Sequence, residues 1–400
     1  MRIVYTCHDS LPSPDTNTQQ TFWTTFEVAR IGVSVDMVVP SLALAASTET
    51  DVRRGLAAYY GASADEWPPT FRVTASGTSA AGSMRKGWFD WSVVRGARDA
   101  DLIWTRDPVA AASAVQAGRP TVFETYRPDY ATRSIFAVWR RACLGSPHLH
   151  TVITHSALAA AAYRNAGVPS HKILVAHNGF TPSLLQPRLT RDQARRQIGI
   201  DADAPLAVYA GQTGVSKGVE SLVHLAADIP SMTLLIVGAD AGSDDGRRLL
   251  REAAACGAGN VILRARVPLA DVAPYLYAAD CLLIPPTAAP MRKFRNTVLP
   301  MKVFMYMAAG RPILAGRLPD IEEVLTDGET ARLVPADDRR EASMALVALF
   351  ADQQLRARLS CDALDASRHH TWAARARRIV DFLEGHIRNP RASSADTVRA

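Results

Sequence analysis

Cysteine is scarce in this 400-residue sequence, and its spacing excludes two kinds of site. The five cysteines are odd in number and never form a CxxC pair: Cys7, Cys143, Cys256, Cys281 and Cys361. A disulfide framework needs an even set of cysteines in a short secreted chain, and a structural zinc site needs closely spaced ligand pairs. We therefore expect free, mostly buried thiols in a reducing compartment, and no metal site.

Long apolar runs and dense basic tracts are also missing. No uninterrupted apolar segment reaches about 18 residues, so no membrane-spanning helix is predicted. The sequence contains no Lys/Arg-rich tract with interleaved aromatic residues, so nucleic-acid binding is not predicted. The formal net charge of +6 is only mildly basic and fits an anionic small ligand or an anionic membrane surface. The start, MRIVYTCHD, is typical of a β-strand rather than of a signal peptide. We expect a cytoplasmic protein and leave open a peripheral contact with the membrane.

Acidic residues are absent between Asp280 and Asp320, although six basic residues lie in that stretch. The pattern predicts a strand at 281–284, a basic loop, a helix at 300–309 that ends at Gly310, and a strand at 313–315. A basic loop that enters a helix N-terminus is suited to bind a diphosphate, because free N–H groups and the helix dipole both favour an anion. The alternative is a solvated basic edge without a ligand.

Short apolar strands alternate with helices along the whole chain, in two successive series. The first series has predicted strands at 2–7, 34–39, 101–105, 121–124, 151–154 and 172–176, and helices at 20–31, 51–62, 109–117, 134–144 and 157–166. The second has strands at 206–210, 233–237, 260–263, 281–284 and 313–315, and helices at 191–198, 219–227, 245–256, 269–279, 300–309, 321–325, 340–351, 353–367 and 372–387. We predict a mobile loop at 75–87 and a linker at 180–190.

This alternation predicts an α/β protein with two doubly wound domains. Ligands of such sheets bind outside the carboxyl ends of the strands, so we expect the site in the cleft between the two halves. A Gly-rich turn, YAGQTGVSKG at 209–218, follows one predicted strand and contains Lys217. Its glycines allow the backbone to approach a ligand, and its lysine offers a mobile charge for a phosphate. An ordinary tight turn is the alternative. The spacing matches neither GxGxxG nor the P-loop, which disfavours NAD binding and ATP hydrolysis.

Seven runs occur in a fixed order with characteristic gaps: LVAHNGF, YAGQTGVSKGVESLV, LLIVGAD, NVILRARVPLADVAPYLYAADCLLIPP, LPMKVFMYMAAGRPILAG, DIEEVLTDGETARLVPADD and TWAARARRIVDFL. Together they make residues 174–387 resemble the C-terminal half of glycosyltransferase family four (glycosyltransferase group 1), and the N-terminal half is similar more loosely. The resemblance implies the GT-B fold, with two facing Rossmann-like doubly wound domains. These would be an acceptor-side domain at 1–179 and a nucleotide-sugar-binding domain at 180–371. A C-terminal helix at 372–388 would cross back onto the N-terminal domain, followed by a disordered tail at 389–400.

The resemblance also implies roles for individual residues. The implied catalytic residues are Lys217 and Lys302, which would neutralise the donor diphosphate, and Tyr126, which would orient the sugar. The implied donor-binding residues are Gly211, Gln212, Gly214, Arg266, Thr297, Val298, Leu299 and Met305. The implied acceptor-side residues are His8, Asn17, Arg106 and Glu124. No metal ligand and no cofactor are implied, because the nucleotide sugar is a co-substrate.

The sequence departs from the family pattern at four of these positions. The family's pair of glutamates, spaced E-x7-E, corresponds to Thr297 and Met305, and neither side chain replaces an ionised acceptor. A family arginine is replaced by Gln212, and the family's active-site histidine corresponds to Tyr126. Loss of one charged contact to a ligand costs about 1.5–3 kcal/mol.

We therefore predict a glycosyltransferase that moves a sugar from a nucleotide diphosphate sugar to an unidentified acceptor. Retention of the anomeric configuration is implied by the resemblance. The acceptor would be a small molecule, a glycan or a lipid-linked group, in carbohydrate or natural-product biosynthesis. The alternative is a catalytically impaired GT-B protein that acts as a binding or activating partner of another transferase.

Overall fold

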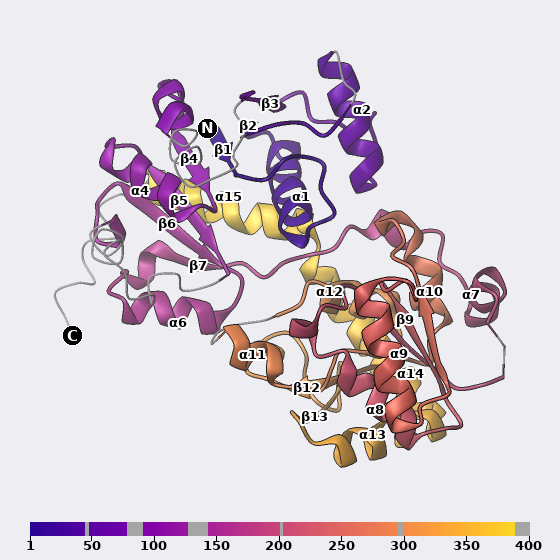
Figure 1. Ribbon diagram of the computed structural model, residues 1–400. Coiled ribbons are helices and arrows are strands. Elements are labelled where there is room, and N and C mark those ends of the chain that lie inside the picture. Colours follow the sequence, from indigo (N-terminus) through magenta and orange to yellow (C-terminus); the bar gives the residue numbers. More distant parts are fainter. Residues whose placement is uncertain (45–47, 78–90, 127–142, 201–202, 295–298, 389–400) are drawn as a thin grey trace. The chain divides into compact units, whose positions relative to one another are not determined.

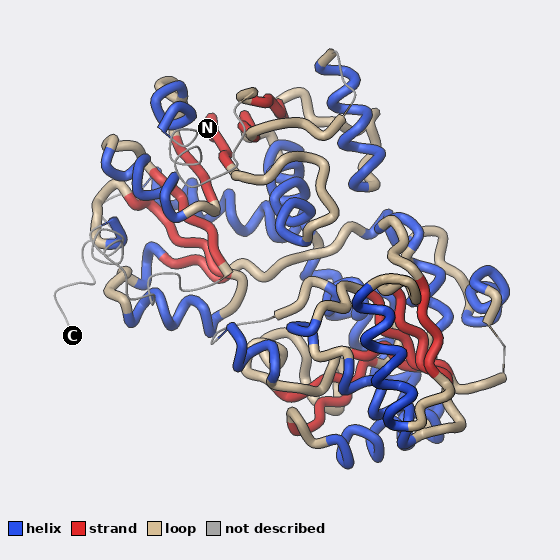
Figure 2. The backbone as a smooth tube through the Cα atoms, in the orientation of Figure 1, coloured by secondary structure: helices blue, strands red, loops and turns tan. Residues whose placement is uncertain are grey.

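The computed structural model describes residues 1–44, 48–77, 91–126, 143–200, 203–294 and 299–388 (Figure 1). These residues form two compact units. The first unit holds Met1–Asn178 together with the C-terminal segment that starts at Trp372, and the second holds Gly179–Thr371. In each unit, helices pack on a central β-sheet, which is drawn in red in Figure 2.

Within the described residues, the first unit has a parallel sheet of seven strands in the order β3-β2-β1-β4-β5-β6-β7. The strands are β1 (Arg2–Thr6), β2 (Ser34–Val39), β3 (Phe71–Ala75), β4 (Leu102–Thr105), β5 (Thr121–Thr125), β6 (Leu149–Thr154) and β7 (Ile173–Val175). The helices around it include α1 (Thr16–Arg30), α2 (Glu49–Tyr60), α4 (Pro108–Gln116), α6 (Ala157–Asn165) and, from the C-terminal segment, α15 (Trp372–Arg388). The direction of winding reverses between the neighbours β1 and β4, so the sheet is doubly wound, as predicted.

The second unit has a parallel sheet of six strands within the described residues, in the order β10-β9-β8-β11-β12-β13. The strands are β8 (Leu206–Ala210), β9 (Thr233–Val237), β10 (Val261–Arg264), β11 (Cys281–Leu283), β12 (Ile313–Arg317) and β13 (Arg332–Pro335). The helices include α7 (Arg191–Ile198), α8 (Glu220–Asp228), α9 (Asp244–Cys256), α10 (Ala273–Ala278), α11 (Ala289–Phe294), α12 (Lys302–Ala309), α13 (Arg339–Ala351) and α14 (Gln353–Ser367). Two buried apolar clusters form on this sheet, one with α10 and α12 and the other with α8, α9 and α13.

Helix boundaries follow local signals in the sequence. Thr190 forms a capping box with Gln193 at the start of α7, and Gly199 ends that helix in the left-handed conformation at φ 67°. The helix α2 begins with a second capping box at Thr48 and ends at Gly61 with φ 75°. Such ends can be recognised from residue type and spacing alone, which is why most of the predicted helices are confirmed.

The sequence analysis missed the edge strand β3. Only Phe71 and Val73 of its five side chains are buried. Phe71 packs against Phe22, Phe26 and Trp67, with ring centroids 5.2–6.2 Å apart. Long-range aromatic packing, rather than a continuous apolar run, therefore holds this strand in the sheet.

Several other predicted elements need correction. The predicted helix at 321–325 is instead a set of hydrogen-bonded turns, in which Glu322 N–H donates to the Leu318 carbonyl at 3.0 Å. The predicted basic loop before α12 contains the short helix α11, and β13 was not predicted. The helix α1 starts at Thr16, four residues before the predicted start, because several threonines there conceal its helical pattern. The predicted linker includes a 3-10 helix, Pro182–Leu185. Most of the predicted helix at 134–144, most of the loop at 75–87 and the tail at 389–400 lie outside the described residues.

A buried ion pair secures the amino end of the second sheet. Asp280, just before β11, accepts hydrogen bonds from Arg191 Nε at 2.7 Å, Arg195 Nη2 at 2.6 Å and the Leu206 backbone N–H at 2.9 Å. The side chain of Arg195 is 0% exposed, and it also donates to the Ala278 carbonyl at 3.0 Å. Asp280 therefore links α7, α10 and β8.

Replacement of Asp280 with alanine is expected to destabilise the second unit strongly. The substitution leaves the buried Arg195 guanidinium without its counter-charge, which costs about 3–5 kcal/mol of unfolding free energy. The matched control is Asp365→Ala, because Asp365 pairs with Arg368 at an exposed position, and such pairs are worth about 0–1 kcal/mol. Urea unfolding monitored by circular dichroism measures both variants. Equal midpoints for the two variants would contradict the role of Asp280.

Candidate functional site

The Gly-rich turn lies at the carboxyl end of β8, in the second unit. Gly211 has φ 148°, and a Cβ atom there would lie 2.6 Å from the Nζ atom of Lys302. Gly218 has φ 69°, and a Cβ atom there would lie 2.4 Å from the Cγ2 atom of Thr287. Glycine is favoured at both positions, since L side chains rarely adopt these φ values and would press against the side chains of Lys302 and Thr287. The turn therefore packs closely between the start of α12 and the loop after β11.

The amino group of Lys302 lies at this edge of the sheet, and among the described residues no ion pair joins it to a carboxylate. Its Nζ atom lies 3.4 Å from the ring centroid of Tyr209, whose hydroxyl donates to the Gln212 carbonyl at 2.5 Å. Burial lowers the pKa of Lys302 well below its ordinary value, and the nearby charge of Lys217 lowers it further. Among the described residues, no carboxylate offsets these two effects. An anion bound beside the two lysines would oppose both effects and raise the pKa of Lys302.

The other predicted donor residues have different exposures. Gly214 starts the 3-10 helix Val215–Lys217, which carries Lys217 and lies next to α11. Gln212 and Arg266 are exposed. Leu299 and Met305 are partly buried and pack against the apolar cluster beneath α12. Thr297 and Val298 lie outside the described residues.

The structure adds Asp337, which the sequence analysis missed. Asp337 has φ 66°, which is uncommon for a residue other than glycine. Its Oδ1 atom accepts from the Thr287 hydroxyl at 2.5 Å and from the Ala288 backbone N–H at 3.3 Å. Its Oδ2 atom lies 2.6 Å from Nη1 of Arg292. Asp337 therefore fixes the loop that packs against the Gly-rich turn. No local motif announced it, because its partners lie about fifty residues away in the sequence.

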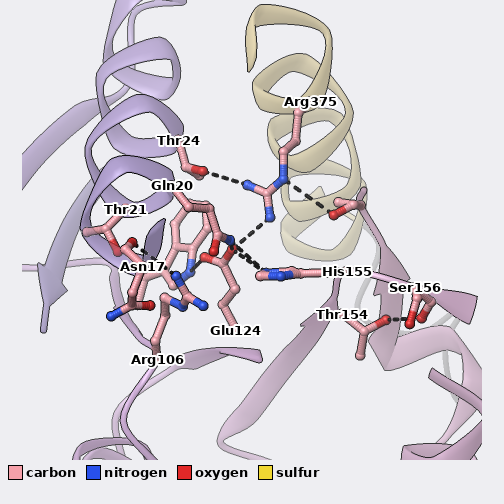
Figure 3. Close-up of polar contacts among 12 residues, drawn as sticks. Asn17, Gln20, Thr21, Thr24, Arg106, Glu124, Thr154, His155, Ser156 and Arg375 are labelled. Atoms are coloured by element: carbon pink, nitrogen blue, oxygen red, sulfur yellow. Dashed lines mark hydrogen bonds and ion pairs between the residues drawn. The ribbon is translucent and has the colours of Figure 1, made fainter. Parts of the chain in front are cut away.

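A buried polar network occupies the carboxyl ends of the central strands of the first unit (Figure 3). Glu124, at the end of β5, is 1% exposed. Its Oε1 atom accepts from Gln20 at 2.6 Å and from Arg375 at 2.7 Å, and it lies 3.1 Å from Nε2 of His155. Its Oε2 atom accepts from the indole N–H of Trp104 at 3.0 Å. Both oxygens of this carboxylate are therefore used by protein groups.

Arg375 attaches the C-terminal helix α15 to this network. Its other nitrogens donate to the Thr24 hydroxyl on α1 at 2.8 Å and to the Ala176 carbonyl after β7 at 3.3 Å. The residue is 4% exposed, and α15 packs along α1. One guanidinium group thus connects the C-terminal segment to α1, β5 and the end of β7. The sequence analysis did not single out Arg375, Gln20 or Thr24.

The network has a defined charge state at neutral pH. Burial alone would raise the pKa of Glu124, but the Arg375 charge and the hydrogen bond with His155 outweigh it and hold that pKa well below its ordinary value. Burial lowers the pKa of His155 from 6.5 to about 4, although the contact with Glu124 opposes this shift. At pH 7, Glu124 is therefore ionised and His155 is neutral.

Stability is expected to fall between pH 6.5 and pH 4. The folded-state pKa of His155 is depressed, so its contribution is fully present above pH 6.5 and is lost as the pH falls through about 4. The loss is at most about 3 kcal/mol, from about 1.4 kcal/mol per pKa unit. His155→Gln is expected to reduce the dependence of stability on pH in this range. His148→Gln, at an exposed position, is expected to leave that dependence unchanged. Urea midpoints measured at pH 7 and pH 4.5 test this, and an unchanged pH slope in His155→Gln would contradict it.

Arg106 and Tyr126 lie above this network. The Arg106 Nη1 atom donates to the Asn17 carbonyl at 3.3 Å, and its guanidinium carbon lies 5.7 Å from the Tyr126 ring centroid. The Tyr126 ring stacks on His155 with centroids 6.2 Å apart and an interplanar angle of 22°. Tyr126 is 41% exposed, whereas the side chain of Asn17 donates to Asp9.

His8 pairs with Asp107 at the same edge. His8 follows β1 and Asp107 follows β4, and the His8 Nδ1 atom lies 2.9 Å from the Asp107 Oδ2 atom. The structure thus gathers His8, Asn17, Arg106 and Tyr126 at the carboxyl edge of the first sheet, with Glu124 buried beneath them. Contact of these residues with an acceptor stays a prediction. Within the described ranges, no three His, Cys, Asp or Glu side chains group closely enough to hold a metal ion.

Residues 204–352 match the family model "Glycosyl transferases group 1". The chain is 28% identical over 215 residues to D-inositol 3-phosphate glycosyltransferase of Xylanimonas cellulosilytica, covering 53% of this chain and 50% of the relative. It is 29% identical over 171 residues to phosphatidyl-myo-inositol mannosyltransferase of Mycolicibacterium smegmatis, covering 43% of this chain and 41% of the relative. The matches thus span about half the length of these curated relatives.

Solved structures match almost the whole chain. Sucrose-phosphate synthase of Thermosynechococcus elongatus has a TM-score of 0.74 at 19% identity, with 97% of this chain and 99% of that chain covered. HepE of Anabaena, solved in complex with UDP-glucose, has a TM-score of 0.72 at 17% identity, with 96% and 100% covered. The chain therefore has the GT-B fold, as predicted. Within that fold class, residues 204–352 are similar to the glycosyl transferases of group 1. No helix in the described ranges combines the length and apolar character that a membrane crossing requires.

Proposed function

We propose that this chain transfers a glycosyl group from a nucleotide diphosphate sugar to a hydroxyl acceptor. The observation that carries the proposal is the position of Lys302, whose Nζ atom lies against the Gly-rich turn and 3.4 Å from the ring centroid of Tyr209. Burial and the charge of Lys217 both lower its pKa, and no carboxylate among the described residues offsets them. Both effects disfavour the charged form of Lys302 in the ligand-free protein. A diphosphate would remove that cost, which is the behaviour expected of a preformed anion site.

The second unit would bind the donor. Backbone N–H groups of the Gly-rich turn and of the start of α12 would face the diphosphate, and the two lysines would stabilise the negative charge that develops on it as the glycosyl bond breaks. The exposed loop that carries Arg266 would flank the nucleobase. HepE, with the same fold, has been solved with UDP-glucose, which supports a nucleotide sugar as the donor class.

The first unit would supply the acceptor side. His8, Asn17 and Arg106 would contact the acceptor, and Tyr126 would orient the sugar. Retention of the anomeric configuration is part of the proposal, on the resemblance to glycosyltransferase group 1, and NMR of the product anomer tests it. No cofactor or metal ion enters the proposed reaction. The acceptor class would be a small molecule, a glycan or a lipid-linked group.

A thermal-shift panel tests the donor site. The full chain is heated with UDP, GDP, ADP, CDP or dTDP and with the corresponding glucose conjugates. A ligand at about a hundred times its dissociation constant adds about 2.7 kcal/mol of stability, which gives a clear shift. We expect a shift for one nucleobase that is lost in Lys217→Ala and kept in Arg251→Ala, an exposed control on α9. Absence of any shift from well-folded protein would contradict the proposal.

The departures at Gln212, Thr297 and Met305 favour a second candidate, a GT-B protein that binds a transferase partner and has no turnover of its own. The same panel separates the two functions when it is combined with an assay of nucleoside diphosphate release. Binding accompanied by turnover supports the enzyme. Binding without turnover supports the partner.

A further inference from the structure

Two carbonyl groups at the tip of the Gly-rich turn are directed toward the protein. The Gln212 carbonyl accepts from the Tyr209 hydroxyl at 2.5 Å, and the Thr213 carbonyl accepts from Nη2 of Arg248 at 2.5 Å. Thr213 itself is only 3% exposed. Side chains from β8 and α9 therefore fix two consecutive peptide groups of the turn.

The N–H groups of the same two peptides point the opposite way. In a planar trans peptide, the N–H of one residue is antiparallel to the carbonyl of the residue before it. Both peptides are trans, since no cis bond among the described residues lies in the turn. The N–H groups of Thr213 and Gly214 are thus directed away from the side chains that hold the carbonyls. Within the described part of the chain, neither of them donates a hydrogen bond. Successive N–H groups of this kind in a turn form a backbone site for an anion.

Arg248 is suited to hold the turn, because its guanidinium group binds three segments at once. Besides the bond to the Thr213 carbonyl, its Nε atom donates to Glu220 at 2.7 Å and its Nη1 atom donates to Asp245. Glu220 is the first residue of α8, and Asp245 lies in the first turn of α9. The Thr213 hydroxyl donates to the second oxygen of Asp245 at 3.3 Å. The turn is therefore attached to the starts of both helices.

Arg248 acts on the turn rather than on the charge of a ligand. Its guanidinium group is paired with two carboxylates, those of Glu220 and Asp245, so its charge is already balanced. Its side chain is 24% exposed. By contrast, Nζ of Lys302 lies 3.4 Å from the ring centroid of Tyr209 and has no ion pair among the described residues. Lys302 would supply charge to a bound anion, whereas Arg248 would supply the geometry of the backbone.

We propose that Arg248 and Tyr209 are positioning residues that preform a backbone site for the donor diphosphate. They keep the two carbonyls on the protein side, so that the N–H groups of Thr213 and Gly214 face the phosphate oxygens. If either peptide rotated, its carbonyl oxygen, which only accepts hydrogen bonds, would face the anion and repel it. The inference rests on the glycosyl transfer proposed above and concerns the second unit alone.

Amide NMR of the wild-type full chain tests the N–H groups directly. The protein is labelled with ¹⁵N-glycine and titrated with the nucleoside diphosphate that shifts its melting temperature most, and then with the corresponding nucleoside. The Gly214 signal is identified by its loss in Gly214→Ala, because a Cβ atom there meets nothing within 4 Å. We expect its amide proton to move downfield with the diphosphate and much less with the nucleoside. The signal of Gly257, at the far end of α9, should stay in place.

Binding to substituted full-length proteins tests the positioning roles. Tyr209→Phe removes only the hydroxyl and leaves the ring beside Lys302, and Arg248→Met removes the guanidinium group. Each is expected to raise the Kd of the nucleoside diphosphate by about tenfold, while the Kd of the nucleoside stays within about threefold of wild type. A general loosening of the fold would weaken both ligands. The matched control is Arg247→Met, because Arg247 pairs with Asp244 at an exposed position on the same helix.

A conservative variant separates geometry from charge. Arg248→Lys keeps the positive charge beside the two carboxylates, but an ammonium group cannot reproduce the planar fork that also reaches the Thr213 carbonyl. We expect Arg248→Lys to be more stable than Arg248→Met in urea unfolding and yet to bind the diphosphate equally weakly.

Two results would overturn the positioning roles alone. One is a Gly214 amide that does not move when the diphosphate saturates the protein. The other is a diphosphate Kd within about threefold of Arg247→Met in both Arg248→Met and Tyr209→Phe. If no nucleotide shifts the melting temperature of the wild type, the proposed function itself fails, and the backbone site fails with it.

Discussion

Replacement of Lys302 with methionine is expected to weaken binding of nucleoside diphosphates by about one to two decades and, at the same time, to raise the melting temperature of the ligand-free protein. Burial and the charge of Lys217 disfavour the Lys302 ammonium group. Methionine has a similar length and removes the charge, together with the contact of Nζ with the Tyr209 ring. Loss of a charged contact costs about 1.5–3 kcal/mol, or about one to two decades of affinity. The stability gain should be about 1 kcal/mol, as is common when a functional strain is removed.

Opposite signs of the two effects make this test specific. A substitution that merely damages the fold lowers both stability and affinity, whereas Lys302→Met should separate them. Lys217 is exposed, so Lys217→Ala is expected to weaken binding without stabilising the ligand-free protein. Arg251→Met, at an exposed position on α9, should change neither quantity. Thermal-shift titration with the nucleotide that binds the wild type measures all four proteins. An unchanged affinity in Lys302→Met would remove this lysine from the donor site.

Replacement of Arg375 with methionine is expected to release α15 and to destabilise the first unit. The buried carboxylate of Glu124 would lose its counter-charge, which costs about 3–5 kcal/mol. The hydrogen bonds to Thr24 and Ala176 would be lost as well. Urea unfolding should show the loss of stability, and amide hydrogen exchange should show loss of protection in α15 and α1.

A matched control is available on the same helix. Arg378 lies three residues further along α15 and is exposed, so Arg378→Met should leave stability within about 0.5 kcal/mol of the wild type. The double variant Glu124→Gln/Arg375→Met should be less destabilised than the sum of the two single variants, because the uncompensated charge is gone. Normal protection of α15 in Arg375→Met would contradict the assigned role. Binding of the nucleotide, which we propose for the second unit, should persist in every one of these variants.

The fold was predictable where local signals are strong. Helix starts are marked by capping boxes such as that of Thr190 and Gln193, and helix ends by left-handed glycines such as Gly199 and Gly310. The residues that form each signal are close together in the sequence. Alternation of strands and helices indicated parallel, doubly wound sheets, because such connections must cross over. The strand β3 and the helix α11 were missed, since tertiary contacts rather than a local pattern determine them.

The candidate site was predictable only in part, for the same physical reason. The Gly-rich turn and Lys217 form a contiguous motif, and Lys302 stands at a recognisable helix start. By contrast, Glu124 and Arg375 are 251 residues apart in the sequence, and no spacing rule connects them. The pairing of His8 with Asp107 depends on β1 and β4 being neighbours, which the sequence alone did not specify.

The central claim is that this chain consumes a nucleotide sugar at the site formed by Lys217 and Lys302. The most direct test incubates the full chain with UDP-, GDP-, ADP-, CDP- and dTDP-glucose and measures release of the nucleoside diphosphate. We predict that one of the five is consumed, and that Lys302→Met and Lys217→Ala abolish its consumption while Arg251→Met does not. Consumption that persists undiminished in both lysine variants, or no consumption of any donor by well-folded protein, would contradict the claim.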